Sequence, residues 1–311
     1  MRILFVFWFT LFPYFGVYAF ENNNGFSGKY FGQMPPGMTP EIFAPHIMSQ
    51  VKPEWAYATA FSPDGREFYF TKFNTKTNID EILVIKHENG AWTEPSVTPF
   101  SGEFNDFDMS LSQDGNKIFF RSKRFLKNTK TLSQYNQLWL SERSKNEWQP
   151  AQPVLDKELN RIEGGYPTKV ESGTLYFSYF NKYNVGKMDI YKSEFINGAY
   201  TKPKSLGPKI NTQYSEGDTF VAPDESYMIV TQWGNPQSKV GSDLYISFNN
   251  NDQWSELINM GDVINTNNNE GCPYISPDGK YFFFLSVSDK KVPEAKTYWV
   301  DAKIIEQFRR Q

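Results

Sequence analysis

The chain has 311 residues and a formal net charge of −3, so its length allows one large or two small domains. A mildly acidic chain lacks the basic excess typical of nucleic-acid-binding proteins, and we expect no nucleic-acid partner. The chain has one cysteine, Cys272, so no intrachain disulfide can form and the core alone must stabilise the fold.

The first 19 residues have the pattern of a secretory signal peptide. Arg2 precedes a continuous apolar run that ends in the small-x-small sequence Val17-Tyr18-Ala19, which predicts cleavage after Ala19. The alternative is an N-terminal membrane anchor, but the run is short and is interrupted by Pro13. No later segment has the ~18 apolar residues of a membrane span. We therefore expect a periplasmic or secreted mature chain without a membrane span.

A tight-turn signal recurs along the chain between two runs of β-forming residues. It reads Ser-Pro-Asp-Gly at 62–65 and 276–279, and Ser-Gln-Asp-Gly at 112–115. Asp-Gly favours a hairpin, because glycine accepts a positive φ and the aspartate bonds back to the turn. With weaker copies at 168–179 and 220–231, the turn position recurs at spacings of 50, 58, 52 and 54 residues. These positions are Gly65, Gly115, Gly173, Glu225 and Gly279.

A second hairpin signal, often Asn-Gly, follows each of the first four turns and ends in a large aromatic residue. These residues are Trp92, Trp148, Tyr200 and Trp254. Each repeat therefore contains four β-runs, which in the fourth copy are about 218–222, 226–232, 243–248 and 254–259. Four antiparallel strands in about 50 residues, repeated, are the signature of an all-β β-propeller. A single blade cannot bury both of its faces, so neighbouring blades stack around a common axis.

The fifth repeat has a third strand at 296–304 but no fourth strand after it. Residues 41–48 match residues 204–211, a fourth-strand segment, so we expect the N-terminal segment to supply the outermost strand of the last blade. This predicts a closed five-bladed propeller over residues 40–305. A six-bladed ring is the alternative, if the 58-residue spacing contains more than one unit. Residues 20–39 are then a flexible N-terminal segment and residues 306–311 a C-terminal tail.

Two segments, 215–247 and 264–284, resemble the WD-like propeller repeat of exported bacterial proteins of the TolB type. The resemblance covers about residues 40–305, and it is strongest in repeats one, four and five. It implies a propeller and export. It does not imply one activity, because such repeats serve as scaffolds, partner-binding modules and accessory domains.

The alternating strand direction gives the disc two unlike faces. Tight turns share one face, which we call the tight-turn face, and long second-to-third loops share the other, the loop-rich face. An acid precedes the inner strands on the loop-rich face, and we expect these acids to surround the mouth of the central channel. With the aromatic loop residues they form the predicted ligand site: Glu54, Asp106, Glu163, Glu216, Glu270, Tyr179 and Trp233. The alternative is structural, with each carboxylate accepting backbone N–H groups at a blade crossing.

The chain lacks the residue patterns of common catalytic and metal sites. Its two histidines, His46 and His87, are distant from the acidic mouth, and no Gly-x-Ser-x-Gly, His-Glu-x-x-His or cysteine–histidine zinc pattern occurs. Calcium is conceivable at the carboxylates, but no ligand-loop spacing supports it, so we expect no cofactor.

The sequence therefore favours a non-catalytic scaffold that binds an envelope protein or a glycan on its loop-rich face. An alternative is a glycan-cleaving hydrolase or lyase, which needs only two suitably spaced carboxylates, here two of Asp106, Glu163, Glu216 and Glu270. A third possibility is a sensor or assembly subunit of an envelope complex. An open pair of acids would support cleavage, and acids buried in hydrogen bonds would oppose it.

Overall fold

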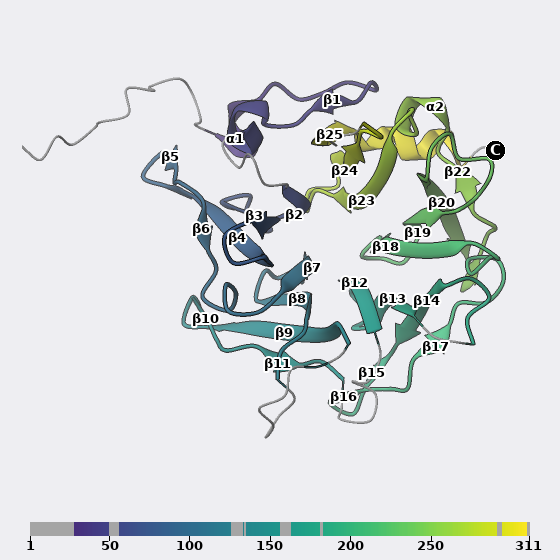
Figure 1. The fold of residues 1–311 in the computed structure, drawn as a ribbon, viewed down its shortest axis with the longest axis horizontal. Coiled ribbons are helices and arrows are strands. Elements are labelled where there is room, and N and C mark those ends of the chain that lie inside the picture. Colours follow the sequence, from purple (N-terminus) through teal and green to yellow (C-terminus); the bar gives the residue numbers. More distant parts are fainter. Residues whose placement is uncertain are drawn as a thin grey trace, which may run out of the picture.

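A computed structural model shows an all-β protein in which five antiparallel sheets surround a central axis (Figure 1). It describes residues 28–49, 56–125, 133, 135–155, 163–180, 183–290 and 294–309. The predicted signal peptide lies outside the described residues. Within the described part of the chain, no helix has the length and apolar character that crossing a bilayer requires. The molecule is a five-bladed β-propeller, as the repeat spacing predicts.

Each blade has four concentric strand positions and contributes one strand to each of the inner three. The innermost strands are β2 (Ala56–Phe61), β7 (Asp106–Leu111), β12 (Glu163–Lys169), β18 (Ser215–Val221) and β23 (Asn269–Ile275). The second strands are β3 (Glu67–Asn74), β8 (Lys117–Ser122), β13 (Leu175–Phe180), β19 (Tyr227–Trp233) and β24 (Tyr281–Val287). The third strands are β4 (Ile79–Glu88), β9 (Gln137–Ser144), β14 (Met188–Ser193), β20 (Ser242–Asn250) and β25 (Ala295–Asp301).

The outermost position of the first four blades is divided into short segments instead of one strand. Its segments are β5 (Ala91–Trp92), β6 (Ser96–Val97), β10 (Glu147–Trp148), β11 (Gln152–Pro153), β16 (Ala199–Tyr200), β17 (Lys204–Ser205), β21 (Gln253–Trp254) and β22 (Ile258–Asn259). In the third blade, β15 (Phe195–Ile196) follows β14 and pairs with β16. In three blades a proline, Pro95, Pro150 or Pro203, lies between the segments. Proline lacks the N–H that a continuous ladder needs, so it interrupts the strand.

The N-terminal segment closes the ring. Strand β1 (Glu41–Ile42) pairs antiparallel with β25, with Glu41 opposite Trp299 and Ile42 opposite Tyr298. This confirms that the segment at 41–48 supplies the outermost strand of the last blade, although the strand is two residues long and helix α1 (Pro45–Ser49) follows it. Figure 1 shows β1 beside β25 at the junction of the first and last blades. Strand β1 therefore covers the outer edge of β25 at these two residues.

Both ends of the described chain pack against the propeller. Phe31, in the 3-10 helix η1 (Lys29–Gly32), belongs to the segment that the sequence predicts to be flexible, yet it is 3% exposed and packs in the core at this junction. After β25, the 3-10 helix η3 (Ala302–Gln307) leads to Phe308, which is also buried. Arg309 then lies over the ring of Phe248 at 4.4 Å. Apolar packing therefore extends into both predicted terminal segments.

Candidate functional site

Two of the predicted site acids, Glu216 and Glu270, are fully buried and hydrogen-bonded. Thr212 donates to Glu216 from Oγ1 at 2.5 Å and from its backbone N–H at 3.1 Å, and Gln232 Nε2 donates at 2.9 Å. Glu270 accepts from Thr266 Oγ1 at 2.6 Å and from Ser286 Oγ at 3.0 Å. These hydrogen bonds hold both carboxylates where one blade leads into the next.

The residue before each of these threonines bonds to the preceding blade. Asn211 Oδ1 accepts the backbone N–H of Ile190 at 2.7 Å, and Asn211 Nδ2 donates to the carbonyl of the same residue at 2.9 Å. Asn265 makes the same pair of bonds with Leu244. The motif Asn-Thr-x-x-x-Glu therefore joins the third strand of one blade to the inner strand of the next.

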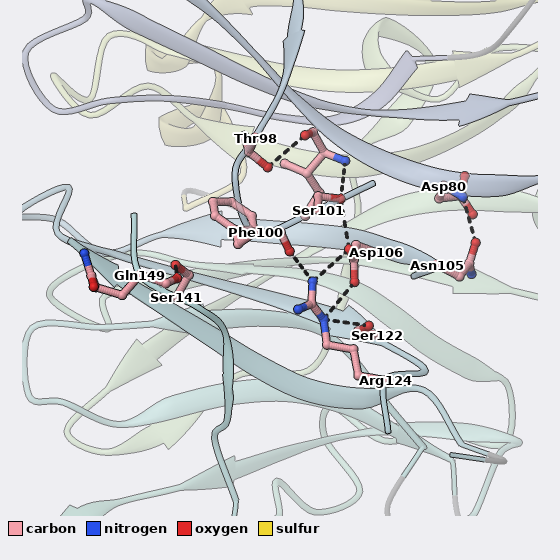
Figure 2. Close-up of polar contacts among 11 residues, drawn as sticks. Asp80, Thr98, Phe100, Ser101, Asn105, Asp106, Ser122, Arg124, Ser141 and Gln149 are labelled. Carbon is pink, nitrogen blue, oxygen red and sulfur yellow. Dashed lines mark hydrogen bonds and ion pairs between the residues drawn. The ribbon is translucent and has the colours of Figure 1, made fainter. Parts of the chain in front are cut away.

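Asp106 occupies the corresponding position in the second blade, with an arginine as its main partner. Arg124 Nη2 lies 2.9 Å from Asp106 Oδ2, and Ser101 Oγ donates to the same oxygen at 2.9 Å. Figure 2 shows Arg124 also donating to the Phe100 carbonyl and to Ser122, while Asn105 accepts the backbone N–H of Asp80. The carboxylate has 0% side-chain exposure, so Arg124 balances a charge that water does not reach.

Burial sets the protonation behaviour of these three acids. Removal from water raises the pKa of Glu216 to about 7, against the lowering effect of its hydrogen bonds. Desolvation likewise raises the pKa of Glu270 and of Asp106, although the charge of Arg124 lowers that of Asp106. Because Asp106, Glu216 and Glu270 are each 0% exposed, none of the three carboxylates has an accessible surface that a ligand could contact.

The other predicted site residues do not complete an acidic ring. Glu163 begins β12, but the strand register places Gly164 in the position that Glu216 occupies in β18. The extra glycine in Glu-Gly-Gly causes this one-residue offset. Glu54 lies outside the described residues. Tyr179 packs edge-on against Tyr191, and Trp233 packs over Gly217, where an added Cβ would lie 2.9 Å from the indole.

A cavity of about 520 Å³ lies on the axis, on the side of the tight turns. The inner strands line it from their midpoints to the turns, with Ala58, Tyr166 and Cys272 at its inner end and Pro63 and Pro277 near its opening. Neither Tyr179 nor Trp233 is among the described residues that line it. The cavity therefore lies in the half of the channel opposite the loop-rich face.

Every inner strand has a β-bulge at the depth of the inner end of this cavity, and the bulge residues of three strands, Ala58, Tyr166 and Cys272, line it. The pairing register shifts at the same place in β2, β7, β12, β18 and β23. One residue at each bulge has a positive φ, and together we call these five residues the axial ring. They are Ala58 (48°), Asp108 (52°), Tyr166 (43°), Asp218 (34°) and Cys272 (52°). Bulges redirect side chains, and this conformation is costly for residues other than glycine.

The axial ring carries a connected set of polar contacts. Asp108 pairs with Arg121 at 2.9 Å, and Asp218 Oδ2 accepts the backbone N–H of Cys272 at 3.2 Å. The Tyr166 hydroxyl lies 2.6 Å from Cys272 Sγ. Desolvation and the nearby charge of Asp108 raise the pKa of Asp218 to about 7, and desolvation raises the pKa of the Cys272 thiol well above its usual range.

Sequence reasoning overlooked the axial ring because its five members are of four different residue types. A usable signal was present, since each lies seven residues before the turn position that defines the repeat. A buried thiol of raised pKa is inert, so Cys272 is no candidate nucleophile. In the described part of the chain, no group of three or more His, Cys, Asp or Glu side chains is placed to hold a metal ion.

Comparisons with known proteins identify the fold. No family model matches the sequence, and no curated protein matches it. The α-L-arabinofuranosidase from Lactobacillus brevis is 14% identical, with a TM-score of 0.50 over 79% of this chain and 92% of that one. The endo-arabinase from Bacteroides thetaiotaomicron is 10% identical, with a TM-score of 0.50 over 85% of this chain and 96% of that one. At these identities the likeness shows a shared propeller fold and nothing further.

Proposed function

We propose that this chain is an exported propeller of the TolB type that binds a carbohydrate in its axial cavity without cleaving it. The observation that carries the proposal is the axial ring. Five equivalent backbone positions carry four different residue types, and three of these residues, Ala58, Tyr166 and Cys272, line the inner end of one cavity. A purely structural position in a repeat tends to keep one residue type, as the buried acids Asp106, Glu216 and Glu270 nearly do.

The size and lining of the cavity suit a sugar. A volume of about 520 Å³ lies within the range of small-molecule sites, roughly 300–1,000 Å³. Its lining combines aromatic residues, among them Tyr166, Phe220 and Tyr274, with the hydroxyl-bearing residues Thr59 and Thr168. Sugars have apolar ring faces and hydroxyl edges, so they need both kinds of contact.

Glycan cleavage is the second candidate, and one observation favours it. Asp108 and Asp218 are two buried acids with different partners, since Asp108 pairs with Arg121 while Asp218 accepts the backbone N–H of Cys272, and desolvation raises the pKa of both. Two carboxylates in different surroundings can act as acid and base at a glycosidic bond. Neither acid is among the described residues that line the cavity, which is why we rank binding first.

The test is a thermal-shift and calorimetric screen of the exported chain against arabinotriose, xylotriose, cellotriose and chitotriose. We expect at least one trisaccharide to raise the melting temperature and to remain intact by mass spectrometry, because bound ligand stabilises only the folded state. Tyr166→Ala should abolish the shift, whereas Tyr183→Ala, at a side chain 79% exposed, should preserve it.

Two other outcomes are informative. Absence of any shift across the four trisaccharides would contradict carbohydrate binding. Release of shorter sugars, lost in Asp218→Asn, would replace the binding function by cleavage.

A further inference from the structure

One position of the inner strand lines the cavity in every blade and is apolar in four of them. It lies three residues after the axial ring, and its residues are Phe61, Leu111, Lys169, Val221 and Ile275. Lys169, in the third blade, is the one cationic side chain among the described residues that line the cavity. The third blade therefore departs from the repeat on the cavity wall.

In the other four blades this position takes part in the apolar packing between blades. Each of the four residues lies opposite an apolar residue of the second strand and packs in the same cluster with it, as Val221 does with Met228. Lys169 lies opposite Leu175, whose cluster joins the second and third blades. Side chains directly opposite in an antiparallel pair lie on the same face of the sheet. Lys169 therefore occupies the place of an apolar residue.

A lysine at this place lowers the stability that the packing could have. Burial of an apolar side chain stabilises a fold in proportion to the area removed from water. Lysine can bury its stem, but its ammonium group stays in contact with water, and Lys169 is half-buried. Positions where a more stabilising residue is available but not used are often functional.

The ammonium group of Lys169 lies near the turn of the second blade without being held there. Hydrogen bonds, chiefly from Ser112, hold the pKa of Asp114 below its ordinary value, and the charge of Lys169 adds to this effect. Asp114 accepts from Ser112 Oγ at 2.5 Å and from the backbone N–H of Asn116 at 3.0 Å. Lys169 forms no ion pair with any carboxylate of the described residues. Its N–H donors are therefore available to a ligand.

The third blade also has an acid at the opening of the cavity. Two residues after Lys169 the turn has Glu171, whereas three other blades have proline at this position and the second blade has Gln113. All five of these residues line the cavity, and Glu171 is exposed. Its backbone N–H donates to the carbonyl of Pro223 at 3.0 Å, which fixes its backbone to the turn of the fourth blade. One blade thus has a donor and an acceptor close together on the cavity wall.

We propose that Lys169 and Glu171 form a subsite at the opening of the axial cavity that binds two neighbouring hydroxyl groups of a neutral sugar. The Lys169 ammonium donates to one hydroxyl oxygen, and the Glu171 carboxylate accepts from the other hydroxyl group. Residues two apart in extended chain are about 7 Å apart, a separation from which two long side chains can converge on one sugar ring. This subsite rests on the proposed function, whose ligand it specifies further.

The charges at the opening favour a neutral sugar over an ionic one. A hydroxyl group both donates and accepts hydrogen bonds, so neighbouring hydroxyl groups can satisfy a cation and an anion together. A ligand carboxylate would meet the negative charges of Glu171 and of Asp224, which also lines the cavity. A ligand ammonium would meet the positive charge of Lys169.

The experiment compares variants with the wild-type chain by calorimetry, with each trisaccharide of the panel and with trigalacturonate as the acidic probe. Lys169→Met keeps an unbranched stem and removes the donors, and Glu171→Ala removes the acceptor. We expect each change to weaken binding of the neutral sugar about tenfold, as for one lost hydrogen bond to a charged group. Lys202→Met and Glu256→Ala, at exposed positions outside the cavity lining, are the matched controls and should change affinity less than about threefold.

Melting temperatures give a readout that does not depend on a sugar. Lys169→Met should melt about 2–4 °C above the wild type, because an apolar side chain then joins the cluster around Leu175. Lys202→Met should not share this gain. A lower melting temperature for Lys169→Met would show that Lys169 serves the stability of the fold and would overturn the subsite.

The sugar results separate the two proposals. A wild-type chain that binds no trisaccharide would overturn carbohydrate binding, and the subsite with it. Trisaccharide binding that survives both Lys169→Met and Glu171→Ala would overturn the subsite alone. Tighter binding of trigalacturonate than of the neutral sugars would overturn the assignment of the subsite to neutral hydroxyl groups.

Discussion

The Glu216 carboxylate combines complete burial with three hydrogen-bond donors supplied by two side chains and one backbone group. The donors stabilise the charged form of the carboxylate, whereas the loss of water disfavours it. The loss of water has the larger effect, so the pKa of Glu216 is raised to about 7. A chemically similar acid, Asp218, has the same pKa but lies beside the axis. Position within the blade, at a crossing for Glu216 and at the bulge beside the axis for Asp218, therefore distinguishes these acids more than their pKa does.

Glu216 should make the stability of the protein depend on pH. Its folded pKa of about 7 exceeds the ordinary value of 4.5, so folding favours the protonated form. The stability it contributes is complete below pH 4.5 and is lost as the pH rises through 7, a change of about 3 kcal/mol. We expect Glu216→Gln to gain stability relative to the wild type by about this amount between pH 4.5 and pH 8 in urea denaturation.

Glu256→Gln, at an exposed position, serves as the control and should follow the wild-type pH profile. If the wild type and Glu216→Gln instead had parallel profiles, the raised pKa of Glu216 would be refuted.

The segment that crosses from one blade to the next repeats the same hydrogen bonds at two places in the ring. In Asn-Thr-x-x-x-Glu the asparagine bonds both backbone groups of a third-strand residue, and the threonine bonds the buried glutamate. Asn265 also donates to Asn259 Oδ1 at 2.9 Å, which joins β22 to the same crossing. Irregular backbone can be buried here because side chains satisfy its polar groups.

Asn265→Ala should therefore destabilise the fold more than the loss of one small side chain would suggest. The change leaves the N–H and the carbonyl of Leu244 without their side-chain partner in a buried position, and we expect a loss of about 2–4 kcal/mol. Chemical denaturation measures the loss. Asn267→Ala, at an exposed position two residues later, should stay within about 0.5 kcal/mol of the wild type. Equal effects of the two substitutions would contradict the role of the crossing.

Closure of the ring is a property of the whole molecule. Phe43 is 0% exposed and packs between the first and last blades, with its ring centroid 4.9 Å from that of Phe283 and 5.1 Å from that of Trp299. Phe61 and Phe68 of the first blade contact the same ring. The N-terminal segment thus joins the two ends of the chain through apolar packing as well as through two strand residues.

Phe43→Ala should weaken the packing between the first and last blades on both sides of the junction. Truncation of a fully buried phenylalanine costs about 3–5 kcal/mol. Because the ring contacts both blades, amide exchange should accelerate together in β2 and in β25, which are far apart in sequence. Hydrogen exchange with mass spectrometry measures this. Met34→Ala, at a side chain 81% exposed, should leave both strands protected. Faster exchange in residues 41–48 alone would mean that the ring remains closed without this contact.

Much of the architecture could be predicted because the turns are local. Gly65, Gly115 and Gly279 adopt the positive φ that an Asp-Gly turn requires, and the spacing between turns gives the blade count. The segment at 41–48 could be assigned to the last blade because it matches an earlier outer strand. The division of the outer strands was not predicted, although Pro95, Pro150 and Pro203 mark three of the breaks.

The candidate site was harder to predict. The Glu-Gly sequence at 163 looks like those at 216 and 270, but one extra glycine shifts the register, and only the pairing of β12 with β13 reveals it. Such equivalences depend on which residues lie opposite one another across strands.

The sequence by itself determined the repeat, the four-stranded blade and the way the ring closes, since hairpin turns and strand periodicity depend on neighbouring residues. Only the tertiary structure decided which acids are buried at the crossings and which residues surround the axis. Ala58, Asp108, Tyr166, Asp218 and Cys272 come from five separate strands. Closure of the ring brings them together, and the bulge in each strand sets their orientation, so no local pattern could have identified them as one site.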